Sequence, residues 1–193
     1  MHMRALIFKN RGLLLSLPAL ALVKRGKPSA ASIAVGLPIA IAGELVRCWA
    51  VGYSGATTRN DVVTAPRLVT AGPYAYVRNP LYIGNFITAI GFAIAFTGKN
   101  CPVMRGLLAG GSLAVMAAVY AAIVPHEEAY LRAQFGADFE RYCERVKRYV
   151  PRGKPIGDPV GEWSADVVRT AESKTFATFA AMLVTLAVRA RQA

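Results

Sequence analysis

Apolar residues in this chain occur in long blocks separated by short segments rich in charged residues, glycine and proline. The four main blocks span residues 13–23, 30–53, 81–96 and 106–124. A helix needs roughly 20 mainly apolar residues to cross a bilayer, so blocks of this kind indicate membrane-spanning helices. We therefore expect an all-α fold, a polytopic membrane helix bundle with about four transmembrane helices.

The first and last apolar runs are short for this role. Residues 13–23 provide only eleven apolar positions between Arg11 and Lys24. This segment spans only if it borrows residues 5–8, and otherwise it lies at the interface. The last helix, expected over residues 163–191, has a short apolar part, and we favour an interfacial or packed position for it.

The third and fourth blocks are joined by the tight turn Gly98–Pro102. So short a connection makes the two helices an antiparallel hairpin. The hairpin returns the chain, at Pro125, to the membrane side on which the third block begins. Residues 72–84, which precede that block, hold two prolines, three tyrosines and an arginine, and Pro80 suits the first helical position. We expect residues 72–84 and the segment after residue 124 to lie together.

Two short helices are expected beyond the hairpin. The first ends at Gly136, a C-cap residue, and the second begins with Asp138 as its N-cap and ends at Pro151. The second helix is amphipathic, with a basic polar face and an aromatic face that suits the membrane interface. The aromatic face repeats at spacings of three, four and three, through Phe139, Tyr142, Val146 and Tyr149.

Composition supports a membrane protein. Of the 193 residues 54% are hydrophobic and 18% are charged, whereas a soluble domain carries about 25% charged residues. The net charge of +12 comes largely from basic residues that flank apolar helices, which is typical of contact with anionic headgroups. We expect the lipid bilayer as partner and no nucleic acid. One integral membrane domain covers residues 1–193, with a linker and C-terminal helix over 155–193.

Other features of the sequence indicate neither metal nor processing. The three cysteines are widely spaced and form no metal-like pair, so we expect neither disulfides nor a metal site. The N-terminus is basic and then apolar like a signal peptide, but Pro28-Ser29 is a poor cleavage site. We therefore expect a retained helix.

Charged residues inside the second block have two interpretations. Glu44 and Arg47 would face the bundle interior, where ionisable residues often have a function. Because they are three positions apart, they could also simply neutralise each other, which we favour. The connection that follows, residues 54–79, carries Arg59, Asp61 and Arg67 and is long for a loop without a function.

Two polar clusters carry the candidate chemistry, and the hairpin brings them to one membrane face. Adjacent carboxylates at the foot of a membrane helix are costly unless cations or hydroxyls pair with them. The simplest alternative is structural: Glu127 and Glu128 bind Arg78 or Arg132, and Arg148 pairs with Glu144 one helical turn away. The clusters are Tyr74, Tyr76, Arg78, Asn79 and Tyr82, and His126, Glu127, Glu128 and Arg148.

Together these clusters resemble a known signature. Residues 78–84, Arg-Asn-Pro-Leu-Tyr-Ile-Gly, are similar to the Arg-His-Pro-x-Tyr-x-Gly motif of the isoprenylcysteine carboxyl methyltransferase and phospholipid methyltransferase superfamily. Residues 125–151 resemble the second half of that signature, in which Glu-Glu follows a helical hairpin and precedes Phe-Gly, an aromatic pair and Arg-aromatic-x-Pro. Asn79 is a departure, because it stands where the family commonly has His.

The resemblance implies an integral membrane enzyme that transfers a methyl group from S-adenosyl-L-methionine, with a cofactor-binding core over residues 72–151. It implies a catalytic role for Asn79, Glu128 and Arg148, and no metal. The cofactor-binding residues that we expect are Tyr74, Arg78, Asn79, Pro80, Tyr82, Gly84, His126, Glu127, Glu128 and Arg148.

The chemistry of these side chains is compatible with that cofactor. A glutamate suits its ammonium or ribose diol, an arginine binds its carboxylate bidentately, and tyrosine faces suit its sulfonium. Methyl transfer needs mainly alignment and exclusion of water, so few catalytic groups are required. Asn79 cannot carry a proton. If a base is needed at that position, another group must provide it, and His126 is the nearby histidine.

The acceptor is not determined by the sequence beyond a lipophilic class: an isoprenylcysteine carboxylate, a phospholipid amine or another small hydrophobic molecule. A sterol-reductase-like NADPH oxidoreductase and a non-catalytic membrane protein are the alternatives, and the oligomeric state stays open. The positive charge around the motif favours a cytoplasmic active site, in the inner membrane of a bacterium or the endoplasmic reticulum of a eukaryote. The basic cluster at residues 24–27 would then lie opposite, against the positive-inside tendency.

Overall fold

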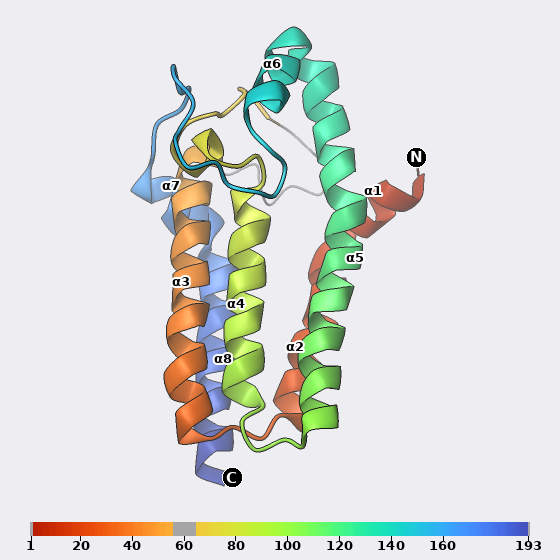
Figure 1. Cartoon of the computed structure of the whole chain (residues 1–193), viewed down its shortest axis with the longest axis vertical. Coiled ribbons are helices and arrows are strands. Elements are labelled where there is room, and N and C mark those ends of the chain that lie inside the picture. The colour runs from red at the N-terminus through yellow and green to blue at the C-terminus, as the bar shows by residue number, and fades with distance from the viewer. Residues whose placement is uncertain (1, 56–64, 193) are drawn as a thin grey trace.

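The computed structural model describes residues 2–55 and 65–192, and all regular structure in these ranges is helical. Arg59 and Asp61 of the long connection lie outside the described residues. The long helices run side by side along one axis, which confirms the predicted all-α bundle (Figure 1). The elements are α1 (His2–Lys9), α2 (Arg11–Arg25), α3 (Ala30–Ser54), the 3-10 turn η2 (Gly72–Ala75), α4 (Pro80–Phe96), α5 (Pro102–Phe135), α6 (Ala137–Arg145), α7 (Ala165–Ala171) and α8 (Ser173–Gln192).

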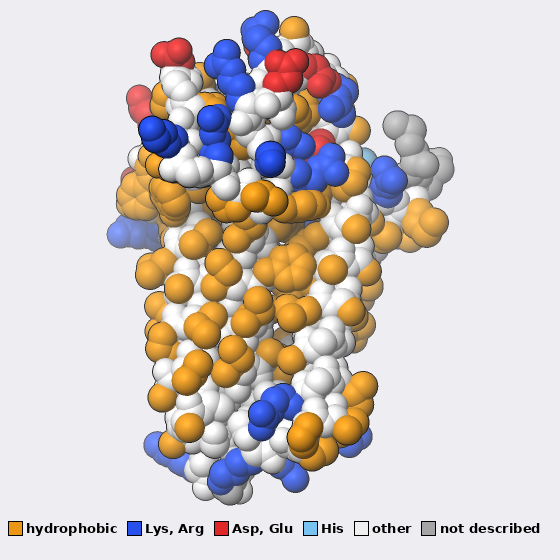
Figure 2. Space-filling model, in the orientation of Figure 1, with side chains coloured by type: hydrophobic (Ala, Val, Ile, Leu, Met, Phe, Trp, Pro, Cys, Tyr) orange, Lys and Arg blue, Asp and Glu red, His pale blue; other side chains and the backbone are white. Residues whose placement is uncertain are grey.

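Two helices among the described residues, α3 and α5, are long and apolar enough to cross a membrane by themselves. The count rises to four if each bent pair is one span: α1 with α2, bent by 60°, and α7 with α8, bent by 65°. The face of the bundle seen in Figure 2 carries a hydrophobic belt across its middle and basic residues at both ends. This pattern is typical of a protein that crosses a bilayer.

Small residues bring α3 and α4 into close contact. A Cβ atom on Gly91 would lie 2.2 Å from the backbone nitrogen of Ala40, and one on Gly43 would lie 2.4 Å from that of Thr88. Close packing of this kind is a main source of association between membrane helices, because lipid removes the hydrophobic drive between them. The two helices therefore form a rigid wall.

The predicted hairpin of α4 and α5 is confirmed. Helix α4 ends at Phe96 and α5 begins at Pro102, with the turn between them at the end of the bundle opposite η2 (Figure 1). The side chain of Asn100 accepts a hydrogen bond from the amide of Lys27 at 2.8 Å and donates one to the carbonyl of Arg25 at 3.0 Å. These bonds join the hairpin to the turn between α2 and α3.

Three helix boundaries that we predicted after the hairpin are wrong: the break at Pro125, the N-cap at Asp138 and the helix end at Pro151. Helix α5 continues through Pro125 to Phe135 as one helix of 34 residues, so its last turns project beyond the hydrophobic belt. Gly136 is the C-cap, as expected, with φ of 50°, but it is also the N-cap of α6. Asp138 therefore lies inside the first turn of α6, where it pairs with Arg141.

Helix α6 ends at Arg145 and not at Pro151. Tyr142 and Val146 are buried on the predicted aromatic face, but Tyr149 is 45% exposed because the chain has left the helix. Beyond Val146 the chain is no longer helical, and its backbone binds the motif segment through Lys147 and Arg152. The last helix also differs from expectation, because it is broken at Glu172 into α7 and α8.

Candidate functional site

The motif segment owes its shape to glycine and proline. Gly72 has φ of 60°, and a Cβ atom there would lie 2.2 Å from the ring of Tyr53, so only glycine fits. Pro73 follows in η2, and Pro80 occupies the first position of α4, where its missing N–H costs nothing. The residues between the two prolines are thereby held in a compact turn above α3 and α4.

The segment that follows α6 is bound to this turn through its backbone. The amide of Arg78 donates to the carbonyl of Lys147 at 3.0 Å, and that of Arg152 donates to the carbonyl of Tyr76 at 3.0 Å. The phenol of Tyr142 donates to the carbonyl of Tyr74 at 2.7 Å. The two halves of the signature, distant in sequence, thus form one unit, as the hairpin predicted.

Glu128 is the centre of the site. Its side chain is nearly fully buried and accepts hydrogen bonds from Arg78 Nε at 3.1 Å and Arg148 Nε at 3.0 Å. Arg148 Nη2 contacts the other carboxylate oxygen, so that pair is bidentate. Arg78 also donates to the carbonyl of Val146 at 2.6 Å. Two cations from different parts of the chain therefore meet on one carboxylate.

This arrangement decides between the alternatives that the sequence left open. Arg148 pairs with Glu128, and not with Glu144 on its own segment. Arg132 pairs with the exposed Glu140 and not with the adjacent carboxylates of α5. The predicted ion pair between Arg78 and Glu128 is present.

Glu127 has a different partner. The phenol of Tyr82 donates to its Oε1 at 2.7 Å, and the ring of Tyr82 lies against that of Tyr120, with centroids 4.4 Å apart. Tyr82 comes from α4, whereas Tyr120 and Glu127 lie about two turns apart on α5. The contact thus connects the two arms of the hairpin at the motif end.

Asn79 is buried and has a holding role in the structure. Its Nδ2 donates to the carbonyl of Arg148 at 3.2 Å, so it keeps the segment that carries Arg148 against the motif. The side chain makes no capping bond to α4. An amide suffices for this bond, because donation to a carbonyl needs no titratable group.

A cavity of about 680 Å³ opens beside these residues, within the size range of small-molecule sites. Its wall at the motif end includes six of the expected cofactor-binding residues. Toward the opposite end of the bundle the lining is mainly apolar and comes from α2, α4, α5 and α8, with Leu22, Phe92, Met116, Phe179 and Met182. The six expected residues in the wall are Tyr74, Arg78, Asn79, Tyr82, Glu127 and Glu128.

The other four expected residues do not line this cavity. Pro80 is buried at the start of α4. Gly84 faces α3, where a Cβ atom would lie 2.7 Å from Cγ of Arg47. The ring of His126 packs edge-on against Phe8 of α1, with centroids 5.9 Å apart. Arg148 contacts two lining residues, Glu128 through its guanidinium and Asn79 through its carbonyl.

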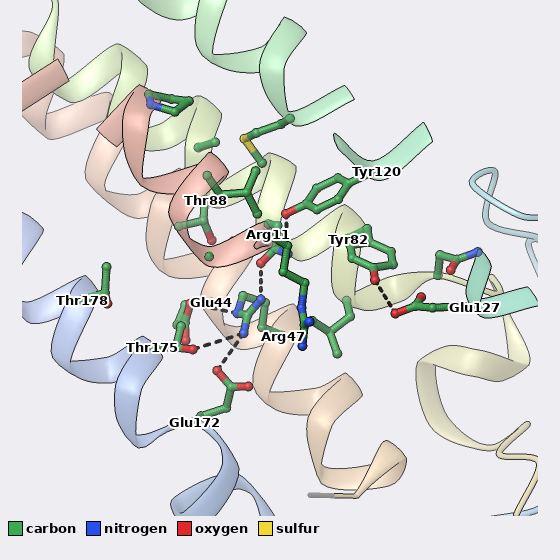
Figure 3. A pocket seen from close by; sticks show the side chains of 18 of the residues that line it. Arg11, Glu44, Arg47, Tyr82, Thr88, Tyr120, Glu127, Glu172, Thr175 and Thr178 are labelled. Carbon is green, nitrogen blue, oxygen red and sulfur yellow. Dashed lines mark hydrogen bonds and ion pairs between the residues drawn. The ribbon is translucent and has the colours of Figure 1, made fainter. Parts of the chain in front are cut away.

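A second polar cluster lines the same cavity. Arg47 Nη2 lies 2.7 Å from Glu172 Oε2, and Arg47 Nε lies 3.4 Å from Glu44 Oε2. Arg47 Nη1 contacts the amide oxygen of Asn85, and Figure 3 shows the guanidinium directed toward Glu44, Glu172 and Thr175. The predicted pair of Glu44 and Arg47 is therefore present but shared with two further helices.

Sequence reasoning identified Glu44 and Arg47 but not their partners Asn85 and Glu172. Asn85 directly follows Gly84 of the motif, and the motif pattern assigns it nothing. Glu172 lies in a mixed polar segment, where a single acid gives no signal. The position of Arg47 inside an apolar block was the signal that could have indicated a further acidic partner, because an arginine buried within a membrane protein needs one.

Burial also disfavours ionisation of the tyrosines at the motif end. It raises the pKa of Tyr74 to about 12 and raises the pKa of Tyr142 strongly, so both phenols keep their protons well into the alkaline range. The hydrogen bond with Glu128 raises the pKa of Arg148. In the described residues, no group of three His, Cys, Asp or Glu side chains could hold a metal ion.

Comparison with known families gives a match to the sequence model described as Phospholipid methyltransferase, over residues 31–138. Two curated rice proteins, from Oryza sativa subsp. indica and subsp. japonica, are each named "Probable protein-S-isoprenylcysteine O-methyltransferase" and are 30% identical over 112 residues. The chain spans about half the length of these relatives, since the alignment covers 55% of each and 56% of this chain. No solved structure matches the chain.

Proposed function

Because the chain belongs to the phospholipid methyltransferase family, we propose that it transfers a methyl group from S-adenosyl-L-methionine to a lipophilic acceptor. The observation that carries this proposal is the wall of the cavity at the motif end. There Arg78 and Glu128 lie beside Tyr82 and Glu127, so cationic, anionic and aromatic groups meet in one cavity inside a membrane bundle.

The donor set fits the cofactor. Its carboxylate suits Arg78, whose guanidinium is held by Glu128 and by the carbonyls of Val146 and Cys143. Its ammonium or ribose diol suits Glu127, a cavity-lining carboxylate that accepts a hydrogen bond from the phenol of Tyr82. We assign Glu128 to holding the two arginines, because both of its oxygens already accept from them.

The reaction needs alignment more than proton transfer. S-adenosylmethionine supplies an electrophilic methyl group on a sulfonium, and the aromatic faces of Tyr74 and Tyr82 suit a cation. Catalytic roles for Asn79, Glu128 and Arg148 remain a proposal. In our assignment the three act together, since Asn79 holds the backbone of Arg148 and Glu128 holds its guanidinium.

The acceptor is proposed to enter the cavity from its apolar end. Residues of α2 and α8, among them Leu22, Phe179 and Met182, line that end and suit a hydrocarbon chain. Prenylcysteine carboxylates, phospholipid amines and other small hydrophobic molecules all fit this description. The cofactor-binding core is proposed to lie within residues 72–151, with α2, α3 and α8 completing the cavity around it.

We propose that the motif end faces the cytoplasm, where the cofactor is made. The positive charge of the segments around the motif supports this orientation. Cysteine accessibility in intact cells tests this proposal. A thiol at Cys101, in the exposed turn at the opposite end, should react with an impermeant reagent applied from outside.

Titration of the purified protein in lipid nanodiscs tests the function. Calorimetry with S-adenosylhomocysteine should show saturable binding at one site, and calorimetry with NADPH should show none. Binding of NADPH alone would favour the reductase, and binding of neither would refute both enzymatic functions. A transfer assay with methyl-labelled cofactor, against membrane lipid extracts and prenylcysteine analogues, then identifies the acceptor.

A further inference from the structure

We propose that Glu172 and Arg47 are positioning residues for the cofactor end of the cavity. They act through a network of side chains that crosses the bundle and reaches Glu127. The inference rests on the proposed binding of S-adenosylmethionine. It assigns a role to the tail helices α7 and α8, which lie beyond the part of the chain matched by the family.

The network begins at the bend between α7 and α8. Glu172 is the C-cap residue of α7, is fully buried and contacts Arg47 Nη2 at 2.7 Å. The other terminal nitrogen of Arg47, Nη1, contacts the side-chain oxygen of Asn85 on α4. Because the guanidinium is planar and rigid, an acid that fixes one nitrogen also fixes the direction of the other.

The network continues into the second arm of the hairpin. Asn85 Nδ2 donates to the phenol oxygen of Tyr120 at 2.8 Å, which leaves its amide oxygen directed at Arg47. The ring of Tyr120 packs against that of Tyr82, whose phenol donates to Glu127 at 2.7 Å. Figure 3 shows Arg47, Tyr120, Tyr82 and Glu127 around one cavity, and all the residues of the network line it.

The network transmits position because each inner member contacts two others. Polar contacts join Glu172, Arg47, Asn85 and Tyr120 in sequence. Ring packing then joins Tyr120 to Tyr82, whose phenol binds Glu127. Hydrogen-bonded side chains in a low-dielectric interior reinforce one another, so the loss of one contact weakens the next. Without the charge of Glu172, Arg47 can turn toward Glu44, its other acidic neighbour, and Asn85 loses its fixed partner. The rings of Tyr120 and Tyr82 then have more freedom, and Glu127 is held less well for the cofactor.

A double-mutant cycle tests this coupling. The variants are Glu172→Gln, Tyr82→Phe and the double variant, and the measurement is calorimetric affinity for S-adenosylhomocysteine in nanodiscs. We expect each single variant to weaken binding about fivefold, and the double variant to be no weaker than the weaker single variant. Asp166→Asn, which converts an exposed tail acid of α7 into an amide, should leave affinity unchanged.

The outcomes separate the two proposals. No binding by the wild-type chain would refute the proposed cofactor, and the inference with it. If the wild type binds, unchanged affinity in Glu172→Gln would refute the network alone, and so would effects that multiply in the double variant. A lowered Tm without a change in affinity would show that the role of Glu172 is purely structural. If Glu172→Gln does not fold, the cycle of Arg47→Lys with Tyr82→Phe decides, because lysine keeps the charge but lacks the rigid guanidinium that contacts Glu172 and Asn85 together.

Discussion

Replacement of Glu128 gives the sharpest test of the site. The obvious variant, Glu128→Ala, leaves Arg78 buried without its acidic partner, since the two side chains are only 13% and 5% exposed. Loss of one partner from a buried pair costs about 3–5 kcal/mol, a large part of the 5–15 kcal/mol that holds most proteins folded. The alanine variant therefore risks unfolding. Glu128→Gln is the better perturbation, because it keeps one oxygen as acceptor and removes the charge.

The expected loss of cofactor affinity follows from the two ion pairs of Glu128. A hydrogen bond to a charged group contributes about 1.5–3 kcal/mol, and this range applies to the buried ion pair of Glu128 with Arg78. The ion pair with Arg148 contributes at most about 1 kcal/mol, since that side chain is 41% exposed and its charge is screened by water. We expect both arginines to lose orientation, and cofactor affinity to fall roughly tenfold to a hundredfold.

The assay is calorimetric titration of S-adenosylhomocysteine, combined with thermal unfolding in the same nanodiscs. Glu140→Gln is the matched control, because it makes the same change in an ion pair whose two side chains are about half exposed. Its affinity should match that of the wild type. Unchanged affinity in a folded Glu128→Gln protein would refute the assignment of Glu128, whatever the result for the control.

Three further predictions test the helix contact, the apolar end and the motif turn. Gly84→Ala should lower Tm, because its Cβ atom would lie 2.9 Å from the carbonyl of Gly43, whereas Gly110→Ala has open space and should not. Met182→Phe should reduce turnover of long-chain acceptors without changing affinity for S-adenosylhomocysteine, and Val184→Phe, exposed on the same helix, should change neither. The pKa of Tyr74 is raised from 10.0 to about 12, so its contribution to stability is complete below pH 10 and is lost as pH rises toward 12. As the pH rises from 10 to 12, the denaturant concentration at the midpoint of unfolding should therefore fall less for Tyr74→Phe than for the wild type. Equal decreases in the two proteins would contradict burial of the phenol.

Much of the fold follows from local patterns in the sequence. Apolar blocks of sufficient length must become helices in a membrane, because lipid offers no partner to an open backbone. The short connection at residues 98–102 then forces the hairpin. Boundaries are less determined, and Pro125 shows why: a proline removes one hydrogen bond, but the packing of α5 carries the helix through it.

The candidate site, like the fold, could be predicted from the sequence only in part. The motif and the hairpin together predicted that residues 72–84 would meet Glu127 and Glu128, and they do. The pairing of Arg148 could not be predicted, because Glu144 and Glu128 were both available. The choice depends on the early end of α6 at Arg145, which is stabilised by backbone contacts with the motif segment.

The stretch from Gly72 to Gly84 by itself specifies a turn, a helix start and a set of charged and aromatic side chains. Its residues act locally: glycine for a left-handed backbone, proline for the first turn, and arginine and tyrosine for charge and aromatic surface. The contact of Arg47 with Glu172, by contrast, joins residues 125 positions apart and depends on how the tail packs against α3. Tertiary structure alone decided it, because a buried charge takes whichever partner the packing of the helices brings within reach.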